Sequence, residues 1–117
     1  MTLLAALAVA GALIPAAASA RSAYCSPSGD LCYGKVRGSS PVKLGITLAA
    51  NYFQRYRLCI TDPHGVRECH RFRIRERENG TYGSVVSWPK HFEYGGKGTY
   101  RARWFALGGA LGPAITF

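Results

Sequence analysis

The stretch from Arg57 to Arg77, RLCITDPHGVRECHRFRIRER, predicts a β-hairpin. Proline suits the first position of a type I turn and glycine suits the left-handed residue after it, so Pro63-His64-Gly65 predicts a three-residue hairpin loop. Counting outward from this loop places Cys59 opposite Cys69. Directly opposed cysteines on antiparallel strands can reach bonding distance at a non-hydrogen-bonded pair. We therefore expect a disulfide between Cys59 and Cys69.

The same register divides the hairpin into two faces. One face carries apolar side chains, namely Tyr56, Leu58, Phe72 and Ile74. The other carries the disulfide and the arginines, namely Arg57, Arg71, Arg73 and Arg75, with Arg55 and Arg67 if both strands stay regular. Alternation of this kind is what a half-buried sheet needs, so the arginines are first of all the solvent side of the hairpin.

Residues 1–20, MTLLAALAVAGALIPAAASA, predict a cleaved signal peptide. They form an Ala-rich apolar run that is short for a bilayer span, and they end in a small-x-small cleavage signal, with cleavage expected near Ala20. An uncleaved anchor is the weaker alternative. Residues 21–117 then form one domain without a transmembrane span, which predicts a secreted or cell-envelope protein.

The domain contains four cysteines, and an even number in a short exported chain indicates disulfides. If the hairpin pair forms, subtraction leaves Cys25 with Cys32, although two other connectivities stay open. A structural zinc site is the weaker alternative, because no CxxC or HxxxH spacing occurs. We expect neither a metal nor a cofactor.

The formal net charge is +9, and residues 1–20 carry no charged side chain. This balance favours anionic partners such as nucleic acid, acidic polysaccharide or anionic lipid. Codon bias in a GC-rich genome accounts for abundant arginine equally well, because eleven of the fifteen cationic residues are Arg.

Further short strands follow from period-two patterns, and no long helical pattern appears. Residues 42–48 alternate Val42, Leu44, Ile46 and Leu48 with polar or small residues. Residues 100–104 alternate Tyr100, Ala102 and Trp104 with two arginines. About seven such strands, separated by turn signals, predict an all-β fold, an antiparallel β-sandwich.

The segment GTYRARW, residues 98–104, resembles the late strand of immunoglobulin-like and fibronectin-type sandwiches, where Gly-x-Tyr-x-small-x-aromatic recurs. The whole mature chain also looks like short exported proteins of actinobacteria, which implies no function. The resemblance implies an immunoglobulin-like β-sandwich with two disulfides, and it carries over no site. The chain departs from true immunoglobulin domains because its predicted disulfides do not bridge the sheets, and Trp88 and Trp104 lie away from the usual core tryptophan.

In an immunoglobulin-like topology the Tyr100 strand lies beside the Arg57 strand. The sheet would then present six arginines together as an anion-binding face, namely Arg57, Arg71, Arg73, Arg75, Arg101 and Arg103. Adjacent like charges destabilise a sheet unless water, salt or a ligand screens them. Only Glu68, Glu76 and Glu78 lie near in the sequence, and by parity none needs to face these arginines. Guanidinium groups pair bidentately with phosphate, sulfate and carboxylate.

The histidines suggest weaker alternatives. His64 is expected at the exposed hairpin tip, and His70 has the inward parity of a partly buried, hydrogen-bonded core residue. His91 with Glu93 and nearby arginines would suit a small secreted nuclease, which needs a base, an acid and cationic phosphate clamps. No motif fixes the geometry of these groups, so we do not expect an enzyme.

The sequence thus predicts an exported, non-enzymatic binding module for an anionic polymer or cell-surface component. The first alternative is an interaction module for a specific protein partner, such as an inhibitor or an assembly subunit, with the PHG or KHFEYGG loop as its epitope. In the simplest alternative, the arginines serve only solubility.

Overall fold

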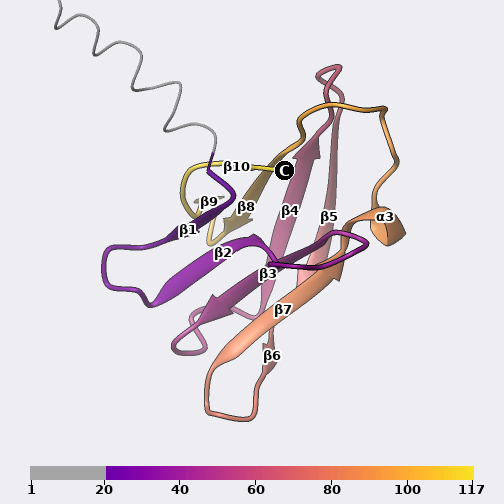
Figure 1. Ribbon diagram of the computed structural model, residues 1–117. Coiled ribbons are helices and arrows are strands. Elements are labelled where there is room, and N and C mark those ends of the chain that lie inside the picture. Colours follow the sequence, from indigo (N-terminus) through magenta and orange to yellow (C-terminus); the bar gives the residue numbers. More distant parts are fainter. Residues whose placement is uncertain (1–20) are drawn as a thin grey trace, which may run out of the picture.

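Two antiparallel sheets packed face to face form the domain (Figure 1), which a computed structural model describes over residues 21–117. The predicted signal peptide, residues 1–20, lies outside the described residues. The first sheet has the order β1 (Ala23–Cys25), β2 (Leu31–Lys35), β3 (Lys43–Leu48), β7 (Tyr82–Ser87) and β6 (Arg75–Glu76). The second has the order β10 (Ile115–Thr116), β8 (Arg101–Ala106), β4 (Arg55–Thr61) and β5 (Arg67–Arg73), with β9 (Gly109–Ala110) paired to β8.

The strand order agrees with the predicted immunoglobulin-like sandwich. In such sandwiches strands A, B, E and D form one sheet, and strands G, F and C form the other. Here β2-β3-β7-β6 takes the first arrangement and β10-β8-β4 the second, with β5 added at the edge beside β4. As expected, β8 lies beside β4, and it pairs Arg103 with Cys59.

The core lies between the two sheets and follows the predicted alternation. Leu44, Ile46 and Leu48 of β3 are fully buried, and so are Ala102 and Trp104 of β8. The sequence leaves the inward face of β7 open, because Val85 favours one parity while Tyr82 and Val86 favour the other. The structure buries Val86 and leaves Val85 49% exposed.

Both expected disulfides are present, Cys25–Cys32 and Cys59–Cys69. Each joins directly opposed residues of one hairpin, so neither disulfide bridges the two sheets. The Asp62 carboxylate supports the β4–β5 loop, because its Oδ1 accepts hydrogen bonds from the backbone N–H groups of His64 and Val66. Gly65 has a φ of 89°, as the predicted three-residue loop requires.

Tyr100, just before β8, ties the preceding loop to the sandwich. Its hydroxyl donates a hydrogen bond to the Gly96 carbonyl at 2.6 Å and accepts one from the Gly95 N–H at 2.9 Å. A tyrosine at the start of this strand, hydrogen-bonded to backbone a few residues upstream, has the same arrangement as the tyrosine corner that immunoglobulin-like sandwiches contain.

Three local expectations need correction. The sequence of residues 89–98, PKHFEYGGKG, predicts a loop, but Trp88–His91 form a helical turn, α3, and the loop follows this turn. The dipeptide Asn79-Gly80 predicts a two-residue hairpin turn, but the connection is longer, because the Arg77 N–H donates a hydrogen bond to the Thr81 carbonyl across three intervening residues. His70 is hydrogen-bonded but not in the core, since its side chain is 43% exposed on β5, the outermost strand of its sheet.

Candidate anion-binding face

Seven arginines lie on the outer face of β4, β5 and β8. We call these seven residues the arginine face, namely Arg55, Arg57, Arg67, Arg71, Arg73, Arg101 and Arg103. All seven are exposed. The pattern follows from the register, in which the inward residues of the three strands fill the core and every second residue is left outside.

Like charges oppose each other directly on this face. Arg57 pairs with Arg71, and Arg55 pairs with Arg73. Both pairs lie an even number of residues from Cys59–Cys69, so they share its closely spaced, non-hydrogen-bonded geometry. Opposed like charges destabilise a sheet, and a bound anion would remove that penalty.

No carboxylate within the described residues 21–117 forms an ion pair with the arginine face, where the one salt bridge joins Glu68 to His70. Glu68 points to the inner side of β5. Its Oε2 bonds His70 Nε2 at 2.7 Å and its Oε1 accepts the Glu93 N–H at 2.9 Å. The Glu93 N–H and then His70 lower the pKa of Glu68. This carboxylate therefore secures the loop after α3 and does not neutralise the arginines.

Phe105 lies within the arginine face and is a residue that sequence reasoning missed. The guanidinium carbon of Arg57 lies 5.1 Å from the centre of the Phe105 ring, and that of Arg67 lies 5.5 Å from it. Arg67 Nη2 also donates to Cys59 Sγ at 3.4 Å. These contacts restrict two guanidinium groups while leaving N–H donors free for a ligand. Phe105 shares the parity of Arg101 and Arg103, so the signal was present in the sequence.

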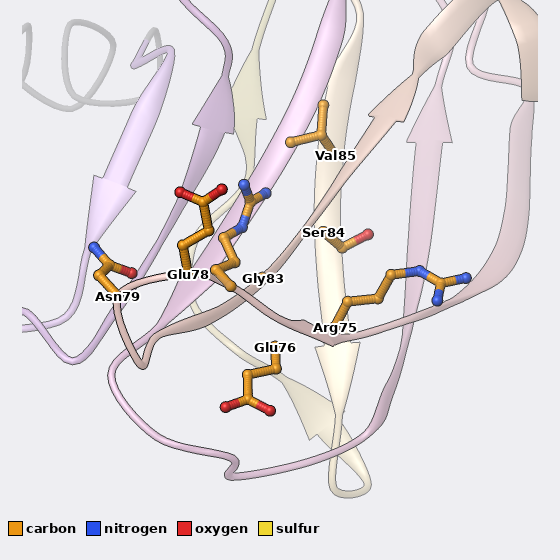
Figure 2. A pocket seen from close by; sticks show the side chains of 8 residues that line it. Arg75, Glu76, Glu78, Asn79, Gly83, Ser84 and Val85 are labelled. Carbon is orange, nitrogen blue, oxygen red and sulfur yellow. The ribbon is translucent and has the colours of Figure 1, made fainter.

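Arg75 does not belong to this face, which corrects the prediction. Strand β5 of the second sheet ends at Arg73, and the chain passes to the first sheet at the half-buried Ile74. Arg75 then pairs with Gly83 of β7 in the first sheet. The alternation of residues between the two faces of a sheet holds only within one strand. The alternating sequence did not show that the chain changes sheets between Arg73 and Arg75. Figure 2 shows Arg75 beside β7, with its side chain directed away from Glu78 and Asn79.

The residues considered for nuclease activity are not brought together with the arginine face. His91 lies at the end of α3, and its ring packs edge-on against Phe72 at 5.2 Å. Phe72 is on the inner side of β5, so His91 and the arginines lie on opposite sides of the strand. Glu93 contributes its backbone N–H to Glu68. In the described part of the chain, no three His, Cys, Asp or Glu side chains gather as metal ligands would.

The two loops considered as protein-binding epitopes form one surface. Gly95 and Gly98 approach the β4–β5 loop so closely that a Cβ at Gly95 would clash with Asp62, and one at Gly98 would clash with Pro63. Tyr94 is 67% exposed beside them. We call this surface, made of residues 62–66 and 92–98, the loop surface. In Figure 1 it lies at the top of the view, where the β4–β5 hairpin meets the segment after α3.

No protein-family model, no curated protein and no solved structure matches this chain. None of the helices in the described part of the chain has the length and apolarity that a membrane span requires.

Proposed function

We propose that this protein is an exported, non-enzymatic binding module whose arginine face holds an anionic polymer or surface. The observation that carries the proposal is the gathering of seven guanidinium groups on one sheet face, with no carboxylate partner among residues 21–117. Planar guanidinium groups match phosphate, sulfate and carboxylate oxygens bidentately. Codon bias in a GC-rich genome would account for the number of arginines, but it would not account for the lack of Asp and Glu at the outward positions of β4, β5 and β8.

Export is part of the proposal. Two disulfides support it, because such bonds persist in oxidising compartments and are rare in reducing ones. The apolar residues 1–20 would direct the chain out of the cell and would be removed near Ala20.

Retention on an anionic polymer resin tests the proposal as salt is raised. The face variant changes four arginines to glutamine, namely Arg71, Arg73, Arg101 and Arg103. The control variant removes the same charge from four exposed residues outside the face, namely Lys35, Arg37, Lys43 and Lys90. We expect the face variant to elute at clearly lower salt than the control variant. Equal elution of the two variants would mean that net charge alone governs retention, and would refute the proposal.

A second candidate function, recognition of a specific protein partner, is favoured by the loop surface. Tyr100 holds one loop through hydrogen bonds to Gly95 and Gly96, Asp62 supports the other loop, and the Tyr94 side chain of the loop surface is exposed. Tyrosine is enriched at interface centres because its ring is large and rigid and its hydroxyl is polar. A Tyr94→Ala variant should lose a stoichiometric partner and keep its polymer retention. Unchanged partner binding would count against this second function.

A further inference from the structure

The turn between β8 and β9 carries an unusual residue. Leu107 and Gly108 are its two central residues, with φ of 55° and 85°. Two-residue hairpin turns with positive φ at both positions strongly prefer Asn, Asp or Gly. Among residues 21–117, Leu107 is the one non-glycine residue with positive φ, and it is 80% exposed. The leucine thus strains the turn and exposes an apolar side chain, without a packing gain inside the fold.

The surroundings of Leu107 connect it to the arginine face. A hollow of about 480 Å³ is lined by this leucine together with Arg55, Arg57, Arg71 and Phe105. The other lining residues are Tyr56 and the turn residues Ala106, Gly108 and Gly109. No acidic side chain lines the hollow. Three guanidinium groups and an exposed aliphatic side chain therefore border the same space.

A simple polyanion would pair with the arginines and make no contact that buries the Leu107 side chain. An amphiphilic anion would use both, because its charged group would pair with guanidinium and its apolar part would cover the leucine. We propose that this hollow binds the phosphate headgroup of an anionic phospholipid at a bilayer surface, with Leu107 inserted between the acyl chains beside it. This inference rests on the proposed function of the arginine face and names its ligand.

The distribution of charge favours a lipid surface over a protein. The seven arginines are spread over three strands, and rows of them face one another across β4 and β5. A layer of anionic headgroups is a diffuse, two-dimensional array that can meet such a face at any lateral position. A protein partner would instead have to place carboxylates or other acceptors at fixed positions that match several of these arginines. Shallow insertion of apolar side chains next to basic residues is the usual mode of binding at the headgroup boundary.

Cosedimentation with vesicles tests the proposal. The vesicles contain phosphatidylcholine mixed with phosphatidylglycerol, or phosphatidylcholine alone. The variant is Leu107→Asn, because asparagine tolerates positive φ and should preserve the fold. We expect the variant to bind the mixed vesicles about tenfold more weakly than the wild type, as loss of one inserted leucine implies. Its retention on the anionic polymer should be unchanged. The ratio between the two proteins should persist as salt is raised, because the lost contact is apolar.

The outcomes separate this inference from the proposed function. Equal binding of wild type and Leu107→Asn to the mixed vesicles would overturn the lipid inference. If the wild type is retained on the anionic polymer but does not bind the mixed vesicles, the lipid inference is also overturned. A protein partner would then be the remaining candidate for contact with Leu107. Equal polymer elution of the face variant and the control variant would instead refute the proposed function itself.

Discussion

Replacing Tyr100 with phenylalanine tests how the loop surface is held. The substitution keeps the ring, which stacks on Phe117 at 5.6 Å, and removes the hydroxyl that bonds Gly95 and Gly96. Tyr100 is only 4% exposed, so water does not easily replace the hydroxyl. Each unsatisfied buried group costs about 1–3 kcal/mol. Gly95 and Gly96 are both half-buried, so water can partly hydrate the backbone groups that lose the hydroxyl. We therefore expect the free energy of unfolding to fall by about 2 kcal/mol in total.

The control is Tyr94→Phe, because Tyr94 is 67% exposed and should lose less than about 0.5 kcal/mol. Urea unfolding, followed by fluorescence, measures both variants against the wild type. For a domain of this size the Tyr100 variant should also melt about 10 °C lower. Equal urea midpoints for the two variants would refute the reasoning that the Tyr100 hydroxyl anchors the loop.

Three further predictions concern stability. Peptide mass mapping should find Cys59 joined to Cys69, and any other pairing would contradict the hairpin register. Replacing both cysteines with alanine should lower the free energy of unfolding by about 2–3 kcal/mol in denaturant titrations. The folded-state pKa of Glu68 is lowered, so its contribution is present above the unfolded value near 4.3 and is lost as pH falls through the folded value. The stability difference between wild type and Glu68→Gln should shrink over that acid range, and a constant difference would contradict the assignment. Burial raises the pKa of both Tyr33 and Tyr56 to about 12, so the free energy of unfolding should fall as pH rises from about 10 through 12. Absorbance titration of the folded protein should find Tyr33 and Tyr56 among its late-ionising tyrosines, and their ionisation at the ordinary pKa would contradict their burial.

The β4–β5 hairpin was predictable because its information is local. The turn chemistry of Pro63-His64-Gly65 fixes the loop, and the loop fixes the register that opposes Cys59 to Cys69. Alternation then assigns the faces of each strand. The pairing of β4 with β8 was predictable from the expected fold class, since strands C and F lie side by side in immunoglobulin-like sandwiches.

The errors arose at three features that an alternating pattern does not encode, namely a change of sheet, the edge position of a strand and the φ angle of a turn residue. Arg75 was misplaced because the chain changes sheets at Ile74, and nothing in an alternating pattern marks such a crossing. His70 was expected in the core, yet it is exposed because β5 lies at the edge of its sheet. The sequence did not predict the positive φ of Leu107, because the neighbouring glycines already indicated a turn. Only the backbone shows which residues of that turn take positive φ.

The salt dependence of binding tests the central claim most directly. A single-stranded oligothymidylate serves as a simple polyanion, and its affinity is measured over a range of salt concentrations for the wild type, the face variant and the control variant. Each phosphate contact on a single strand contributes about −0.7 to the slope of log affinity against log salt. Losing four arginines from one binding surface should therefore flatten the slope by about 3, while the control variant should keep nearly the wild-type slope. Equal flattening in both variants would contradict the account, because the seven arginines would then not act as one surface.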